Sequence, residues 1–195
     1  MNSINYAAEW RTSFFKLLES DPRAPFLKDA SLNADLDTWT KLLTGIVVES
    51  CIALGWTTAA KGHRCKTLPV SRSEYLSLDV MAFDEERSGW KFPVAVFELE
   101  NSTDPNIVSY ALWKLLCVRA SLRILFCYRP RPEEGLELVR RLHSSVIQPM
   151  PIEERVKVDG SLILCVGNRH HAGTFPYDFF RWWIFDKHTG NFTRM

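Results

Sequence analysis

The chain has 195 residues, a length that fits one domain, and we expect residues 1–195 to fold as a single domain. Hydrophobic residues make up 46% of the chain and charged residues 24%, which is typical of a globular protein with a sizeable core. The formal net charge of +1 excludes a histone-like or strongly acidic protein, but it is compatible with a local basic groove.

The N-terminal third is predicted to be helical. Apolar residues recur at helical spacing from Tyr6 to Leu18, which predicts an amphipathic helix there, and residues 25–36 read as a connecting loop. Asp37 is the expected N-cap of a second helix that runs to about Leu54, where Gly55 closes it.

Three strands are predicted next, in residues 56–60, 75–83 and 92–100, and they form a hairpin or a short antiparallel meander. Residues 84–89 form the turn between the last two. Asp104 and Pro105 then start a helix that runs to about residue 120, because aspartate caps helices and proline suits the first helical position.

The remaining elements alternate between strand and helix. We expect a strand in residues 122–128, an amphipathic helix in 132–145, a strand in 161–167, and a final hairpin formed by 179–186 and 191–193. The order predicts an α/β fold, with a mixed sheet flanked by helices, an added N-terminal helix and added C-terminal strands.

The cysteines and the N-terminus point to a cytoplasmic protein. Five scattered cysteines without a CxxC motif support neither a zinc ribbon nor a disulfide framework, so we expect buried free thiols. The first ten residues lack the basic and apolar regions of a signal peptide, and no apolar run approaches the length of a membrane span. We therefore expect no membrane partner.

Two glutamates close the most hydrophobic strand. Glu98 and Glu100 follow Val94–Phe97 directly, and the period of two along a strand places both on one face. A charge at the end of a core strand is costly unless a metal, a cation or water receives it. A strand end that frays into solvent would explain Glu100, but it explains Glu98 less well, because Phe97 and Leu99 flank it.

Three further charged residues interrupt apolar elements. Asp79 lies within the predicted strand 75–83, Lys114 is the only charge in the apolar helix segment 107–118, and Glu49 falls on the apolar stripe of the helix before them. The alternatives are an exposed strand face for Asp79, a snorkelling lysine, and a Glu49 that reaches solvent from the edge of its stripe. Together, strand-end carboxylates and a lysine indicate metal-dependent phosphodiester chemistry, and oxygen ligands favour Mg²⁺ or Mn²⁺.

Basic residues precede or follow these strands. Lys61, Arg64 and Lys66 lie just before the Asp79 strand, and Arg129 and Arg131 follow the strand after the Lys114 helix. Such loops contact the phosphates of nucleic acid without reading its bases. The alternative is that they are ordinary solvated loops.

The order of these residues resembles the PD-(D/E)xK nuclease superfamily, which has the restriction-endonuclease-like fold. Its αβββαβ core matches the order from Thr38 to Tyr128, so the core would span about residues 37–130, with 1–36 and 131–195 as additions. The resemblance implies that Asp79 and Glu98 bind the divalent metal and that Glu49 assists as a further metal ligand. Glu100 stands where the family has lysine, and Lys114 would be that lysine, moved to the following helix. Leu78 replaces the proline of the motif.

The resemblance implies a Mg²⁺-dependent (or Mn²⁺-dependent) nuclease that hydrolyses phosphodiester bonds of nucleic acid, with DNA as the expected form. Lys114 would position or activate the attacking water, and Glu100 would complete the metal shell or orient water. The alternative is a catalytically inactive nuclease-fold module that binds nucleic acid or protein, which the departure at Glu100 keeps open. An unrelated α/β interaction domain, with Trp182 and Trp183 on an exposed surface, is also open. A homodimer or a protein partner is undecided.

Overall fold

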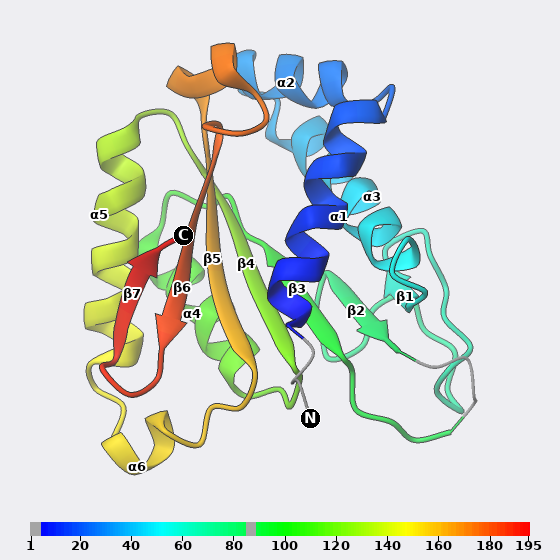
Figure 1. Ribbon diagram of the computed structural model, residues 1–195, viewed down its shortest axis with the longest axis vertical. Coiled ribbons are helices and arrows are strands. Elements are labelled where there is room, and N and C mark those ends of the chain that lie inside the picture. Colours follow the sequence, from blue (N-terminus) through cyan, green and yellow to red (C-terminus); the bar gives the residue numbers. More distant parts are fainter. Residues whose placement is uncertain (1–4, 85–88) are drawn as a thin grey trace. The chain divides into compact units, whose positions relative to one another are not determined.

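The protein is an α/β fold, seen in a computed structural model that describes residues 5–84 and 89–195. Its seven strands form a mixed sheet in chain order, β1 to β7, with helices flanking it (Figure 1). The chain divides into two compact units, Met1–Val96 with Ala120–Leu122, and Phe97–Arg119 with Arg123–Met195. Each unit is described by itself.

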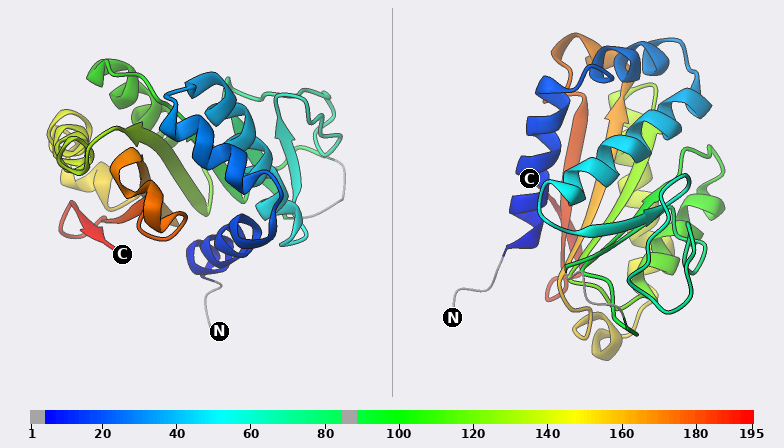
Figure 2. Two further views of the ribbon diagram at one scale, coloured as in Figure 1. Left: turned by 90° about the horizontal axis from the view of Figure 1, so that it is seen from above. Right: turned by 90° about the vertical axis from the view of Figure 1, so that its right-hand side faces the viewer.

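The first unit begins with three helices, α1 (Tyr6–Ser20), α2 (Ala24–Leu32) and α3 (Leu36–Ile52), and both α1 and α2 pack on α3 (Figure 2). The N-terminal helix was predicted, but the loop predicted in residues 25–36 is wrong, because most of it belongs to α2. Pro25 lies in the first turn of α2, where a missing N–H costs nothing, and Leu27 and Ala30 are buried.

The N-cap of α3 is Asp35 rather than the predicted Asp37. The Asp35 side chain accepts a hydrogen bond from the Thr38 backbone N–H at 3.1 Å, the contact that defines an N-cap, and Asp37 lies within the first turn. Gly55 follows the helix with a φ of 79°, a conformation that glycine adopts without steric strain.

Strands β1 (Thr57–Ala60) and β2 (Val80–Phe83) pair antiparallel, from Thr57 opposite Phe83 to Ala60 opposite Val80. The predicted strand 75–83 therefore starts too early. Leu76 and Ser77 have φ values of 56° and 53°, and the Leu78 N–H bonds the Tyr75 carbonyl at 3.0 Å, which closes a turn. Asp79 lies at a bend directly before β2 rather than in mid-strand. Of the predicted turn 84–89, residues 85–88 lie outside the described part of the chain.

Strand β3 (Ala95–Leu99) is shorter than the predicted strand 92–100. At its start, the Val94 N–H donates to the Ala82 carbonyl at 2.9 Å, and the Val94 carbonyl accepts from the Leu122 N–H at 2.9 Å. At its end, the Glu100 N–H donates to the Phe126 carbonyl at 2.8 Å. From the Val94–Leu122 bond to the Glu100–Phe126 bond, the residue numbers increase along both segments. Strand β3 therefore runs parallel to the strand that begins at Leu122.

The second unit continues the alternation predicted from residue 105 onward. It contains α4 (Pro105–Leu116), β4 (Leu122–Arg129), α5 (Pro132–Leu142), the π-helical turn η1 (His143–Ile147), α6 (Ile152–Arg155), β5 (Ser161–Asn168), the 3₁₀ segment η2 (Arg169–Thr174), β6 (Phe180–Asp186) and β7 (Asn191–Arg194). The predicted strands, the α4 and α5 helices and the final hairpin are present; α6 and η2 were not predicted. β6 pairs antiparallel with both β5 and β7.

Helix α4 ends at Leu116, earlier than the predicted residue 120, and a buried arginine donates hydrogen bonds to carbonyls at and just beyond this end. Arg123 donates to the Leu115 carbonyl at 3.1 Å and to the Val118 carbonyl at 2.8 Å. Its other nitrogen donates to the Asp159 carbonyl at 2.6 Å. Burial lowers the pKa of this guanidinium from its usual value. Arg123 thus joins the end of α4 to the segment before β5.

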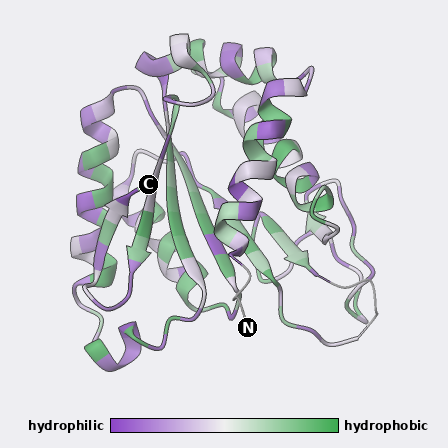
Figure 3. Ribbon diagram, viewed as in Figure 1, coloured by the Kyte–Doolittle hydropathy of each residue, from purple (hydrophilic) through white to green (hydrophobic). Residues whose placement is uncertain are grey.

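The strands of the sheet are mainly hydrophobic (Figure 3). All eight residues of β4 are buried, as expected for a strand covered on both faces. Trp182 and Trp183 are also buried, and the Trp182 ring lies 5.8 Å from that of Phe126 in an edge-to-face arrangement. The exposed aromatic surface that was considered at these tryptophans is therefore wrong.

Candidate functional site

Glu98 and Lys114 are brought together in the second unit. Glu98 lies in β3 and is only 5% exposed, and the Nζ of Lys114 from α4 lies 2.9 Å from its Oε2. Helical side chains lean toward the N-terminus of their helix, which carries the ammonium back toward the strand that precedes α4. The Lys114 side chain is 18% exposed, so water and small solutes reach one side of the pair.

The turn between β3 and α4 positions this pair. Glu100 accepts a hydrogen bond from the Ser102 N–H at 2.8 Å, and the Ser102 hydroxyl accepts one from the Asp104 N–H at 3.0 Å. Asp104 caps α4 by accepting from the Asn106 N–H at 2.8 Å. Glu100 therefore holds the turn, although its sequence position is the one where the PD-(D/E)xK motif has lysine.

Asp79 lies in the first unit, on the wall of a cavity of about 840 Å³. Lys41, Lys61 and His63 line the same cavity together with the acidic Asp37 and Glu74, so its lining carries charges of both signs. Lys61 was predicted as a phosphate contact, whereas Lys41 was not. The sequence feature that could have identified Lys41 is its place on the polar face of α3, one turn after Asp37.

Glu49 belongs to a different cluster of the first unit. Its carboxylate pairs with Arg23, which also pairs with Asp21, and the Glu49 side chain is 44% exposed rather than turned toward the sheet. The hydrogen bond from Arg23 holds the pKa of Asp21 below its usual value, and the same contact raises the pKa of Arg23. The role of Arg23 was not predicted from the sequence, because only the folded chain brings it next to Glu49 of α3.

The five basic residues predicted to contact phosphate differ in their surroundings. Lys61, Arg64 and Lys66 are exposed in the connection between β1 and β2. Arg129 is buried and donates to the carbonyls of Tyr128 and Ser102. Arg131 is exposed, but it pairs with Glu134 at the start of α5. The first three keep their charge on the surface, whereas the arginines of the second unit make contacts within the chain.

The candidate metal ligands are two carboxylates, Asp79 of the first unit and Glu98 of the second. Within residues 5–84 and 89–195, no group of three or more histidine, cysteine, aspartate or glutamate side chains gathers to hold a metal. Mg²⁺ is commonly held by one or two carboxylates together with waters and substrate phosphates, so it does not require such a group. The oxygens of Asp79 and Glu98 are of the kind that this ion prefers.

Comparison of the chain with protein-family models, with curated proteins and with solved structures found no match. In the part of the chain that the structure describes, no helix combines the length and the apolar character that crossing a membrane requires. The placement of side chains is therefore what points to a function.

Proposed function

We propose that the protein is a metal-dependent nuclease that hydrolyses phosphodiester bonds of nucleic acid, with DNA as the expected form. The contact between Glu98 and Lys114 carries the proposal. Removing a carboxylate and an ammonium from water is costly, so a largely buried pair of this kind is a candidate for a functional role. The element order α3-β1-β2-β3-α4-β4 agrees with the αβββαβ core of the PD-(D/E)xK superfamily.

Each residue has a defined role in this proposal. Asp79 and Glu98 would hold Mg²⁺ or Mn²⁺, and the ion would supply polarisation of the phosphate and a lower pKa of bound water. Lys114, positioned by its contact with Glu98, donates hydrogen bonds to the attacking water or to the negative charge that develops on the phosphate. Glu49 would act only from outside the metal shell, since its carboxylate is engaged by Arg23.

The first unit supplies a surface for the nucleic-acid backbone. Lys61, Arg64 and Lys66 are exposed, and Lys41 and His63 lie with Asp79 around one cavity. Lysines and arginines at loops bind phosphates through charge, which makes binding weaken as salt rises. We expect binding without strong sequence preference.

A second candidate is a catalytically inactive module of the same fold that binds nucleic acid or protein. It is favoured by the engagement of Glu100 in a turn, at the position where the motif has lysine. Such a module would bind oligonucleotides but would not cleave them, with or without metal.

The test is cleavage of labelled single-stranded DNA, duplex DNA and RNA in Mg²⁺ or Mn²⁺. The variants Glu98→Gln, Lys114→Met and Asp79→Asn keep the side-chain shape, and we expect each to slow cleavage by roughly a hundred-fold or more, since each removes a charge used in the transition state. The matched control is Lys157→Met, because Lys157 forms an exposed ion pair with Glu154 at 3.0 Å in the same unit. It should cleave like the wild type.

The outcomes separate the candidates. Equal cleavage by all variants would mean that a contaminant is responsible, and it would sink the proposal. Binding without cleavage by the wild type would establish the inactive module. If Asp79 and Glu98 act on one metal ion, the double variant should lose little more than either single variant, because the two effects are not independent.

A further inference from the structure

Helix α4 exposes a pair of aromatic rings on its outer side. Tyr110 is 59% exposed and Trp113 is 54% exposed, and their rings stack with centroids 6.0 Å apart and planes at 28°. Large aromatic side chains exposed together mark binding surfaces more often than single exposed residues do. Both rings are therefore accessible to a binding partner.

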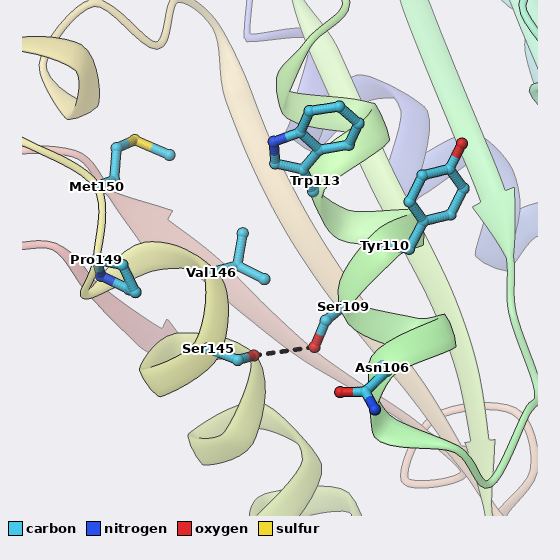
Figure 4. A pocket seen from close by; sticks show the side chains of 8 residues that line it. All are labelled: Asn106, Ser109, Tyr110, Trp113, Ser145, Val146, Pro149 and Met150. Atoms are coloured by element: carbon cyan, nitrogen blue, oxygen red, sulfur yellow. Dashed lines mark hydrogen bonds between the residues drawn. The ribbon is translucent and has the colours of Figure 1, made fainter.

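These rings border a groove of about 500 Å³ between α4 and the π-helical turn η1 (Figure 4). The hydroxyls of Ser109 and Ser145 hydrogen-bond across it at 2.9 Å, and Val146, Pro149 and Met150 form the side opposite Trp113. π-Helical turns are rare and occur frequently at functional sites. The groove is therefore a shaped feature with one aromatic wall and one apolar wall.

The chemistry of the groove suits a flat aromatic group that carries hydrogen-bonding edges. The Asn106 side chain offers both a donor and an acceptor, and none of the residues that line the groove is acidic. The Tyr110 ring centre lies 5.9 Å from the Lys114 ammonium. A ligand on these rings would thus extend toward the Lys114 ammonium, which also contacts Glu98, and a nucleobase with its attached phosphate matches this arrangement.

We propose that the Tyr110–Trp113 pair is a stacking site for an unpaired nucleobase, and that the nucleic acid beside Lys114 is single-stranded. This inference rests on the proposed nuclease function and names the form of its substrate. Bases in a duplex stack on each other and cannot offer their faces to a protein, whereas single strands bind through aromatic stacking and positive charge. Tyr110 links the aromatic pair to the charged residue, because the Lys114 ammonium lies over its ring.

The test is the affinity of the full chain for a fluorescent oligonucleotide in EDTA, which prevents metal-dependent cleavage. Trp113→Ala should weaken single-strand binding by roughly five-fold or more, the range found for single base–aromatic contacts, and Trp113→Phe should restore most of it. Ile107→Ala is the matched control, because Ile107 is 46% exposed on α4 but does not line the groove. It should bind like the wild type.

The Trp113 side chain is uncharged, so removing it takes away no contact with a phosphate. Trp113→Ala should therefore leave the dependence of affinity on salt concentration unchanged. It should also leave binding of the same sequence as a duplex unchanged. The proposal would be overturned if Trp113→Ala bound single strands as tightly as the wild type does, or if it lost equal affinity for single strands and duplexes. An apolar protein segment would then be the remaining candidate to occupy the groove. These results are independent of cleavage, so a failure of the nuclease function is seen separately.

Discussion

The Glu98–Lys114 pair of the second unit and the Asp21–Arg23–Glu49 cluster of the first unit contain the same kinds of charged groups in different surroundings. Glu98 is 5% exposed and meets one ammonium, whereas the Glu49 side chain is 44% exposed and shares a guanidinium with Asp21. Both glutamates stand in apolar patterns of the sequence. The comparison teaches that burial and partner, rather than position in such a pattern, separate a candidate catalytic acid from a structural ion pair.

The largest expected effect on stability comes from removing the ammonium beside Glu98. Lys114→Met should lower the free energy of unfolding by about 3 kcal/mol, because a buried carboxylate loses its opposite charge. Urea unfolding measures this loss, and Glu98→Gln combined with Lys114→Met should recover much of it. If the double variant is no more stable than Lys114→Met alone, the pair does not account for the stability.

The Asp21–Arg23–Glu49 cluster of the first unit should contribute less to the free energy of unfolding than the Glu98–Lys114 pair does. Arg23→Met should cost about 1 kcal/mol, since solvent screens an arginine and a glutamate that are both partly exposed. Urea unfolding under the same conditions provides the comparison. A loss greater than that of Lys114→Met would reverse the order that burial predicts.

The pH dependence of the same cluster follows from Asp21. Its pKa is lowered from 3.8 in the folded state, so folding favours the carboxylate, and the stabilisation is present above pH 3.8. It is lost as the pH falls through the lower, folded-state pKa. Asp21→Asn should therefore be less stable than the wild type at neutral pH, and the difference should shrink at acidic pH. A difference that stays constant down to the acid unfolding transition would contradict this assignment.

The smallest effect is expected at Gly45, on the helix face that Arg23 covers. A Cβ at this position would lie 2.9 Å from the Arg23 Nη1, so Gly45→Ala must shift the guanidinium, while alanine favours the helix by about 1 kcal/mol. We expect a net change within about 0.5 kcal/mol in the wild type. Thermal unfolding should show a clear gain from Gly45→Ala only in the Arg23→Met background; equal gains in both backgrounds would show that Arg23 does not restrict this position.

Apolar runs and helical periodicity were sufficient for most of the fold. The helices α1, α4 and α5 follow the period of 3.6, several strands are continuous apolar runs, and each was predicted near its observed place. The failures have local causes. Leu76 and Ser77 adopt positive φ beside apolar residues, which no hydrophobic pattern reveals, and α2 is short, with Pro25 in its first turn.

The site was predicted less completely, because its residues depend on contacts between distant segments. Lys114 was predicted as the motif lysine moved to the following helix, and it contacts Glu98. Arg129 was predicted as a phosphate contact, yet it donates to backbone carbonyls in the interior. The sequence around an arginine at a strand end does not reveal whether its guanidinium bonds a backbone carbonyl or is exposed and able to bind a phosphate.

By itself, the sequence determined the order of helices and strands and the identity of the charged residues that interrupt them, since both depend on local spacing. Only the tertiary structure decided which of those charges are buried, which cation each carboxylate meets, and that Tyr110 and Trp113 lie exposed beside a groove. The physical reason is that burial and pairing are set by chain segments far apart in sequence, whose approach no local pattern encodes.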